Sequence, residues 1–511
     1  MQVFKMENLL KFMLYLFLCF LFVTVVLFID HKPFIFSPGK VLELYWYIFI
    51  ALVIAATLLI LKLSRIVNNI SYRDNSKVLI TLVILTVVTI TPRLIWVYLF
   101  NVNPNPNHDF GLYHVLATEI AQGTLGENSY IAKFPHVIGY PTILSIFYKL
   151  FGANVVWAKL LNVLSSCGIS ILLYFIGRII KGNKTGVACA LIWALWPSQI
   201  FYSTLVCTEI VFMFMLLLVY FIFIYARNAV SNIRTLTLLL LLCGVLTAFT
   251  NTIRPFGLLM VLALTISCVA IGIKKPFMPN RHSSILFIGV IIIGYVITSS
   301  ALSTLISHTI KQKTASFPVG FNAYVGQNYS YSGCWNEEDA LEFAQIYDNS
   351  GRDVQKVHNI FLHKAIDRFF GQKLISFELL INKHDVMWLT DADSLDNTQR
   401  SEMDNPTRSL FTTYYSVLVL LSNFYYYIIL MLSLFIWIII LNKGKGFSKD
   451  IYIFVMTILS VVFLHMILEV SPRYHCPTVP MLAVLCGVGL SAVNEVSLNK
   501  RDESPESHFF S

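Results

Sequence analysis

Long apolar runs separated by shorter polar segments dominate the chain. A run of about 20 apolar residues is long enough to cross the hydrocarbon core of a bilayer, and a helix satisfies its own backbone hydrogen bonds there. On this criterion the pattern predicts an all-α polytopic membrane protein with about twelve transmembrane helices. We expect these helices at residues 8–29, 43–62, 78–100, 155–180, 186–204, 208–226, 235–253, 256–273, 284–306, 412–441, 450–470 and 477–495.

Two polar regions are too long to be simple turns. The first, residues 101–154, ends in an amphipathic stretch that we expect to lie in the membrane interface. The second, residues 307–410, is predicted to be a small, mainly helical subdomain. They divide the chain into N-terminal helices (1–100), a first external loop with an interfacial helix (101–154), a transmembrane core (155–306), an external subdomain (307–410), C-terminal helices (411–498) and a tail (499–511).

The composition excludes a water-soluble globule. Hydrophobic residues make up 57% of the chain and charged residues only 13%, and the mean hydropathy is +0.70. Such values are far from those of soluble domains. The net charge of +9 fits a chain that contacts anionic lipid headgroups, and it requires no nucleic-acid partner.

The distribution of Lys and Arg predicts the orientation, because cytoplasmic loops of membrane proteins retain positive charge. One alternating set of short connections, which includes both chain ends, carries 19 of the 37 basic residues. We therefore expect both termini in the cytoplasm. The regions 101–154 and 307–410 would then lie on the extracytoplasmic face.

The first polar region carries the strongest candidate for chemistry, Asp109. It follows the run NPNPNH directly after a long apolar segment, which holds a carboxylate close to the predicted membrane surface. An Asp here also suits the N-cap of a helix over FGLYHVLATEIAQG, so capping alone could account for it. Tyr113 lies one turn along that helix. Lys133 and His136 could meet an anionic group, although a Lys that snorkels to ordinary lipid phosphate is an equal alternative.

Three further charged residues fall at predicted outer ends of helices. Glu209 lies in STLVCTEIVFMF, where an ionisable side chain near the membrane is costly; its alternative role is a helix-start carboxylate favoured by the helix dipole. Arg254 lies in TNTIRPFG, and Arg473 lies in SPRYHCP with Tyr474 beside it. A guanidinium at such a place suits bidentate capture of a phosphate, and binding of generic lipid headgroups is the alternative.

Several blocks of the chain carry a family resemblance. They are NHDFGLYHVLATEIAQG (107–123), KFPHVIGYPTILSIFYKLFG (133–152), AKLLNVLSSCGISILLYFIGRIIKG (158–182), ALIWALWPSQIFYSTLVCTE (190–209) and, more weakly, PRYHCPTVPML (472–482). Together they resemble the GT-C glycosyltransferases, specifically the bacterial group similar to protein O-mannosyltransferases and to the aminoarabinose transferase of lipid A. In the aminoarabinose transferases a Glu-Lys-Pro-Pro segment stands where this chain has Ala132-Lys133-Phe134-Pro135, so the acid of that segment is missing here.

The resemblance implies a GT-C-like fold and transfer of a sugar from a polyprenyl-phosphate donor to an extracytoplasmic acceptor, with inversion. Asp109 inherits the role of the acid in the first external loop and would act as general base. Arg473, assisted by Arg254 or Lys133, would stabilise the leaving phosphate, and Glu209 could orient hydroxyl groups. The expected substrate-binding set is Glu209, Arg254, Lys133, His136, Arg473, Tyr474 and Tyr113.

The expected partners are the lipid-linked sugar donor, an envelope polysaccharide, lipid or protein as acceptor, and membrane lipids. No cofactor is indicated with certainty, and a divalent metal stays open. The main alternative is a flippase or transporter for a lipid-linked sugar, which should show polar residues through the midplane and broken helices. Most of the predicted spans are instead uninterrupted apolar runs. A Gly-rich nucleotide loop followed by Lys and Ser or Thr does not occur, so ATP-driven work is not indicated.

Overall fold

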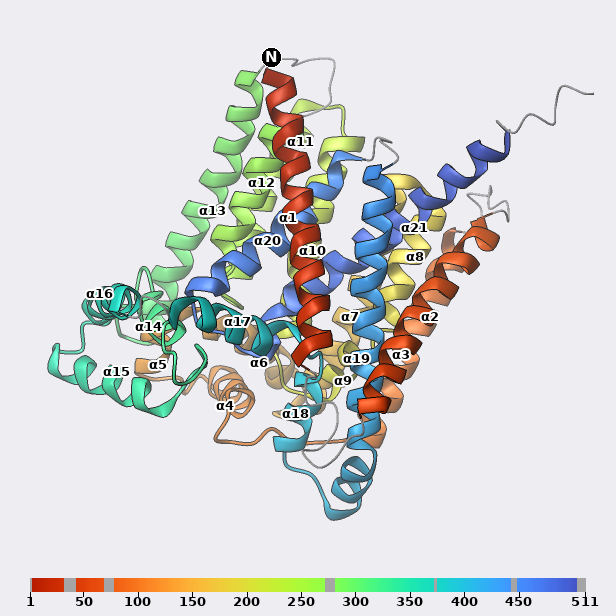
Figure 1. The fold of residues 1–511 in the computed structure, drawn as a ribbon. Helices are drawn as coiled ribbons and strands as arrows, with labels where there is room; N and C mark the ends of the chain where they lie inside the picture. Colours follow the sequence, from red (N-terminus) through yellow and green to blue (C-terminus); the bar gives the residue numbers. More distant parts are fainter. Residues whose placement is uncertain are drawn as a thin grey trace, which may run out of the picture.

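Helices make up nearly all of the structure (Figure 1). The computed structural model describes residues 2–31, 43–68, 78–271, 281–371, 375–442 and 448–502. No strand is found within these ranges, where one isolated antiparallel bridge joins Asn103 to Glu402. The end of the predicted tail, residues 503–511, lies outside the described residues. The prediction of an all-α polytopic membrane protein is confirmed.

The described residues hold nine helices that are long and apolar enough to cross a membrane. Seven are α1 (Gln2–His31), α3 (Val78–Leu99), α7 (Val156–Lys181), α10 (Glu209–Ala229), α11 (Ile233–Asn251), α13 (Arg281–Thr309) and α19 (Asn405–Asn442). The other two spans, Lys449–Ile467 and Pro472–Ala492, contain α20 (Tyr452–Ile467) and the first part of α21 (Val479–Asp502), each with the 3₁₀ turn that precedes it. Two shorter apolar helices belong to α2 (Glu43–Asn68) and α12 (Gly257–Ile271). The expected count of twelve is therefore not confirmed, although each of these helices falls on an expected run.

The expectation of one continuous helix over residues 186–204 is wrong. The chain forms α8 (Asn183–Ala194), α9 (Pro197–Phe201) and the 3₁₀ turn η3 (Tyr202–Thr204) instead. Pro197 causes the break, because it has no N–H and disfavours a helical residue before it. Accordingly Trp196 takes the extended conformation, with φ −72° and ψ 111°.

A buried arginine compensates for the early end of α8. Arg93, on α3, donates hydrogen bonds from Nη1 to the carbonyl oxygen of Ala194 at 3.0 Å and to that of Thr89 in its own helix at 2.8 Å. The last carbonyl groups of a helix have no partner within that helix, and leaving them unpaired in an apolar environment is costly. Arg93 thus joins α3 to α8 by hydrogen bonds, and its role is to hold these two helices together.

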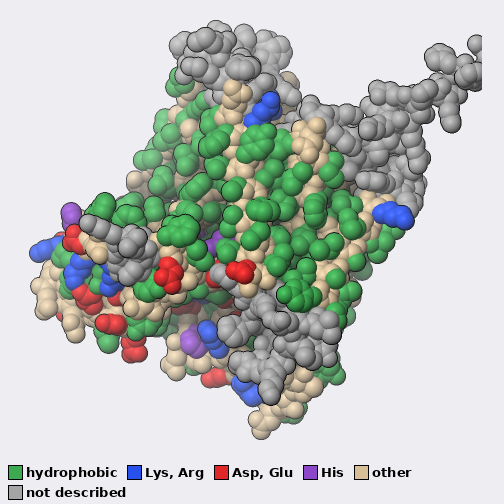
Figure 2. All heavy atoms as spheres, in the orientation of Figure 1, with side chains coloured by type: hydrophobic (Ala, Val, Ile, Leu, Met, Phe, Trp, Pro, Cys, Tyr) green, Lys and Arg blue, Asp and Glu red, His purple; other side chains and the backbone are tan. Residues whose placement is uncertain are grey.

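The two polar regions gather at one end of the helix bundle, opposite the start of α1 (Figure 1). The first region forms α4 (Asp109–Gln122), α5 (Ser129–Lys133), the 3₁₀ turn η2 (Pro135–Ile138) and α6 (Gly139–Phe151). The second forms α14 (Gly320–Gly326), α15 (Glu337–Asn349), α16 (Val354–Gly371), α17 (Ile375–Trp388) and α18 (Asp393–Arg400). We call this end of the bundle the loop end. Figure 2 shows hydrophobic side chains on the sides of the bundle and charged ones gathered at the loop end.

The two polar regions pack on each other as well as on the bundle. Phe134 lies in an aromatic cluster with Phe321, Phe343 and His358 of the second region. The backbone N–H of Ala315 also donates to the carbonyl oxygen of Ala132 at 2.9 Å. A 3₁₀ turn that precedes α21, η5 (Pro472–Thr478), packs against α10, α17 and α20. The loop end is therefore one packed body, and η5 lies within it.

Candidate active site

Asp109 is the first residue of α4 and does not cap it. The N-cap is His108, which has φ −119° and ψ 163° and makes no side-chain capping hydrogen bond. The turn before α4 is tight: a Cβ atom on Gly111 would lie 2.3 Å from the carbonyl oxygen of Asn105. Helix capping therefore does not account for Asp109, and its carboxylate has a different partner.

That partner is Arg473, in η5. Its Nη2 donates a hydrogen bond to Oδ2 of Asp109 within an ion pair, and the Arg473 side chain is 20% exposed against 40% for Asp109. Burial alone raises the pKa of the Asp109 carboxyl, but the charge and the hydrogen bond of Arg473 outweigh it, so the pKa lies below its usual value. The guanidinium also lies 5.9 Å from the centres of the Phe110 and Tyr474 rings. Two candidates far apart in sequence thus form one unit, in which the carboxylate is ionised.

A second ion pair joins Glu209 to Arg254. Glu209 is the first residue of α10 and is fully buried, and its Oε1 accepts a hydrogen bond from Nη2 of Arg254. Nε of Arg254 donates to Oγ1 of Thr208 at 3.1 Å. Burial lowers the pKa of Arg254, and the carboxylate of Glu209 more than reverses this effect. The pair is buried, whereas surface pairs in the same chain, such as Arg352 with Asp348, are mostly exposed.

The two ion pairs form one electrostatic cluster at the loop end. Besides burial, which raises the pKa of the Tyr113 hydroxyl, the charges of Asp109, Arg473, Glu209 and Arg254 all act on it. Arg254 also contributes to the lowered pKa of Asp109. Because such effects fall off with distance, Tyr113 lies close to both pairs. The structure therefore brings together five of the residues selected from the sequence.

His136 lies beside this cluster but is neutral. Burial, together with the nearby charge of Arg254, lowers its pKa to about 4. Its Nδ1 atom is buried and has no hydrogen-bond partner within the part of the chain that the structure describes. A neutral imidazole has one N–H donor and one acceptor nitrogen. His136 can therefore offer a hydrogen bond to a substrate, but it cannot hold an anion as a cation.

Lys133 does not join the cluster. Its Nζ lies 3.9 Å from the centre of the Tyr347 ring and 5.8 Å from that of Phe343, both on α15. Burial lowers its pKa, and the charges that act on it are those of Asp348 and Arg352. We therefore assign Lys133 to the packing between α5 and α15, and the expected help to Arg473 has no geometric support.

One residue of the site was not selected from the sequence: Glu469, between α20 and η5. Only 8% of this residue is exposed. Its Oε1 accepts a hydrogen bond from the Tyr474 hydroxyl at 3.1 Å, and its Oε2 accepts one from Nδ2 of Asn322 at 3.3 Å. An isolated acid four residues before Arg473, at the end of an apolar run, was the available signal.

Asp391 and Asp393 form an Asp-x-Asp pair, but both carboxylates have structural partners. Oδ2 of Asp391 accepts hydrogen bonds from Trp196 Nε1 and Ser198 Oγ, both at 2.7 Å. Its Oδ1 lies 3.2 Å from Nε2 of His475. The Tyr202 hydroxyl donates to Oδ2 of Asp393 at 2.7 Å. These bonds fasten the start of α18 to α9, η3 and η5.

The described residues contain no group of three or more His, Cys, Asp or Glu side chains placed to hold a metal ion. Each carboxylate of the cluster already faces a cation or hydrogen-bond donors. The donor set therefore does not fit a metal ion.

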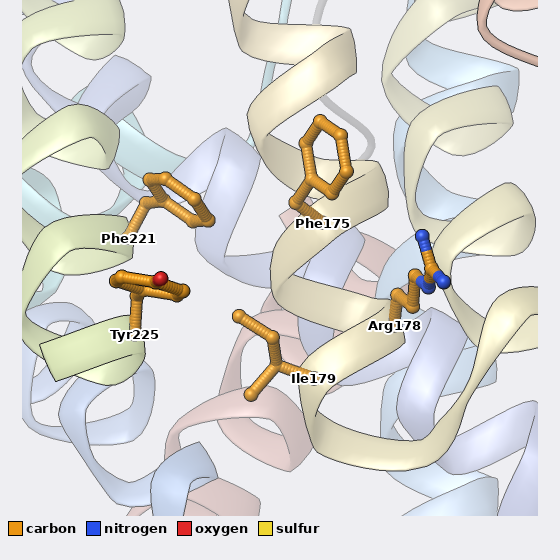
Figure 3. A pocket seen from close by; sticks show the side chains of 5 residues that line it. All are labelled: Phe175, Arg178, Ile179, Phe221 and Tyr225. Carbon is orange, nitrogen blue, oxygen red and sulfur yellow. The ribbon is translucent and has the colours of Figure 1, made fainter. Parts of the chain in front are cut away.

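A groove lies elsewhere, between α7 and α10 (Figure 3). It has a volume of about 440 Å³ and is lined by Phe175, Arg178, Ile179, Phe221 and Tyr225. At a rise of about 1.5 Å per residue, the groove lies about 18 Å or more along α10 from Glu209. Three of its five lining side chains are aromatic (Figure 3), and the groove does not belong to the charged cluster.

Comparison with known families supports the expected relationship. Residues 119–322 match the family model for dolichyl-phosphate-mannose-protein mannosyltransferase. The predicted family resemblance is confirmed. This family consists of glycosyltransferases. The matched segment, which is less than half of the chain, includes Glu209 and Arg254, while Asp109 and Arg473 lie outside it. No curated protein matches the chain.

Solved structures with a similar arrangement of helices have low sequence identity. The apo oligosaccharyltransferase from Archaeoglobus fulgidus is 14% identical, with a TM-score of 0.47; 85% of this chain is covered and 52% of that one. ArnT from Cupriavidus metallidurans, bound to undecaprenyl phosphate, is 11% identical, with a TM-score of 0.36 and 83% and 81% of the two chains covered. The chain thus spans about half the length of the archaeal enzyme.

Proposed function

We propose that this protein is a membrane glycosyltransferase that moves a sugar from a polyprenyl-phosphate donor to an acceptor hydroxyl, with inversion at the anomeric carbon. The observation that carries the proposal is the ion pair of Asp109 with Arg473 at the loop end, where a carboxylate and a guanidinium meet. The family match supports the type of reaction. Among the similar structures, one of the Archaeoglobus fulgidus oligosaccharyltransferase, AglB, contains a dolichol-phosphate, and ArnT contains undecaprenyl phosphate. Both lipids agree with the proposed donor class.

The ion pair suggests how the site is activated. A donor phosphate competes with Asp109 for the guanidinium of Arg473, which can bind a phosphate through two parallel N–H groups. When the phosphate replaces the carboxylate, Asp109 loses the partner that holds its pKa down. Its affinity for a proton then rises. Binding of the donor therefore prepares the base.

At the anomeric carbon the reaction forms one bond and breaks one bond, and a proton is transferred to Asp109. The acceptor oxygen attacks the anomeric carbon while its proton passes to Asp109, which acts as general base. The bond between the anomeric carbon and the phosphate oxygen breaks, and its electron pair leaves with the polyprenyl phosphate. Arg473 stabilises the negative charge that grows on this oxygen. Arg254 adds positive charge nearby, and Glu209, Tyr113 and His136 offer groups that orient sugar or acceptor hydroxyls.

The loop end is proposed to face the extracytoplasmic side, with both termini in the cytoplasm. The bias of Lys and Arg toward the other set of connections supports this orientation. Lipid-linked donors and envelope acceptors, whether polysaccharide, lipid or protein, would be available there. The identities of the sugar and of the acceptor are determined by the transfer assay described next.

The direct test is sugar transfer by purified protein in nanodiscs. Radiolabelled sugars on a panel of synthetic polyprenyl phosphates are offered together with an envelope extract, and labelled product is measured. We expect transfer from at least one donor. Absence of transfer from every donor, together with movement of the lipid-linked sugar across the membrane of reconstituted vesicles, would replace the transferase by a flippase.

Arg473→Lys is expected to raise the KM for the donor about tenfold. Lysine keeps the positive charge but lacks the planar guanidinium, so one of the two hydrogen bonds to the phosphate is lost. A charge-assisted hydrogen bond contributes about 1.5 kcal/mol, which corresponds to about a factor of ten in affinity. Steady-state kinetics with varied donor measure the change. Arg368→Lys is the matched control, because Arg368 donates two hydrogen bonds to Asp339 outside the cluster. Equal effects of both variants would contradict a phosphate-binding role for Arg473.

A further inference from the structure

Glu469 lies where α14 meets the segment that leads into η5. Its backbone N–H donates to the carbonyl oxygen of Asn322 at 2.8 Å, and the N–H of the next residue, Val470, donates to that of Gly333 at 2.9 Å. A Cβ atom on Gly326 would lie 2.3 Å from the carbonyl carbon of Leu468, so the two backbones touch. The subdomain after residue 307 is therefore fixed directly to the residues that precede Arg473.

The carboxyl group of Glu469 extends this contact toward the ion pair. It accepts hydrogen bonds from Asn322, on α14, and from Tyr474, in η5. Tyr474 adjoins Arg473, whose guanidinium lies 5.9 Å from the centre of the Tyr474 ring. Glu469 thus connects α14 to Arg473 through the hydroxyl group of Tyr474.

Charged and titratable groups of several elements lie near Glu469, while α14 contributes the uncharged Asn322. Burial is the largest cause that raises its pKa, to about 7; the charge of Asp109 also raises it, while the Tyr474 hydrogen bond and the charges of Arg473 and Lys383 oppose the change. The groups that face it are Asp109 of α4, Tyr130 of α5, Lys383 of α17, His465 of α20, Arg473 and Tyr474 of η5, and Cys334.

We propose that Glu469 is a positioning residue for the donor phosphate, and that it favours donor binding in its protonated form. This inference rests on the proposed function. When the carboxyl is protonated, it holds Tyr474 and Asn322 without adding charge, so the positive charge of Arg473 is available to the phosphate. When it ionises, a buried negative charge appears near Arg473 and opposes the anion. Donor affinity then falls.

The sign of the pH dependence follows from this competition. The donor is a phosphodiester and keeps one negative charge between pH 6 and pH 8, so the donor itself does not titrate. Ionisation of Glu469 as the pH rises through about 7 should raise the donor KM, by up to about tenfold at pH 8. The kcat at saturating donor should change much less.

Glu469→Gln tests the proposal because it imitates the uncharged carboxyl. We expect its donor KM to stay near the wild-type value at pH 6 and to lose its dependence on pH between 6 and 8. Glu342→Gln is the matched control: Glu342 accepts a hydrogen bond from Tyr324 and pairs with Lys364, outside the cluster. That variant should keep the wild-type pH profile of the donor KM.

Two outcomes would overturn the inference. One is a Glu469→Gln protein whose donor KM rises with pH as in the wild type. The other needs no variant: a wild-type donor KM that is constant from pH 6 to pH 8. Failure of the wild type to transfer sugar from any donor would instead remove the proposed function, so the two failures are distinguishable.

Discussion

Replacing Asp109 with Asn is expected to lower kcat about 10²–10⁴-fold while the donor KM does not rise. The size of the fall is that of a lost general base. The KM is preserved because Asn no longer forms the ion pair with Arg473 that the donor phosphate must displace. Transfer of labelled sugar at varied donor concentration separates the two constants, and a purified protein that remains monodisperse in nanodiscs shows that the fold is kept.

The matched control for this variant is Glu119→Gln, which removes a carboxylate from the same helix, α4. Glu119 has no ion-pair partner within the part of the chain that the structure describes, and we expect its loss to leave kcat unchanged. If Asp109→Asn kept full kcat, the assignment of the base would be wrong. If kcat were kept but the donor KM changed, Asp109 would be a binding residue only.

The second large effect concerns the stability contributed by Glu209 and Arg254. Arg254→Met leaves the carboxylate of Glu209, which is fully buried, without its cation. Breaking a buried ion pair in this way costs about 3–5 kcal/mol. We expect a loss of this order in the free energy of unfolding, measured by titration with a denaturing detergent in mixed micelles.

The double variant Glu209→Gln with Arg254→Met should recover most of that stability. Removing both charges also removes the cost of burying them, and such replacements are often neutral. Sugar transfer by the double variant should be low, because the charges near the proposed phosphate site are lost. A double variant less stable than Arg254→Met would show that the pair does not act as a unit.

The sequence predicted the helices well because hydrocarbon leaves the backbone few choices. Apolar runs such as 78–100 and 208–226 must form helices to satisfy their N–H and C=O groups, and α3 and α10 follow them closely. The run 186–204 failed for a local reason. Pro197 stops the helix. Arg93, which lies far away in the sequence, donates a hydrogen bond to the carbonyl oxygen of Ala194 that the early helix end leaves without a partner in the helix. A hydropathy pattern cannot predict this contact between residues that are far apart in the sequence.

The site was predictable in its members but not in its pairing. Asp109, Glu209, Arg254 and Arg473 stood out because charges beside apolar runs are costly. Which of them pair with each other could not be predicted, since Asp109 and Arg473 are separated by 364 positions. Lys133 looked like part of the site from its place in the loop, whereas packing turns it toward Tyr347. Glu469 was missed because an acid at the end of a helix usually faces water.

The mutual neutralisation of Asp109 and Arg473 would matter for a phosphate-binding site that is surrounded by lipid. Ordinary phospholipids carry phosphates too, and they far outnumber any lipid-linked sugar. An unpaired arginine would be occupied by them at once. In the proposed site every phosphate would first have to displace the Asp109 carboxylate, so a headgroup that brings only its charge would gain little. Under the proposed function, a donor whose sugar also contacts the surrounding side chains would exceed this threshold, and the ion pair would protect the resting protein from inhibition by ordinary phospholipids.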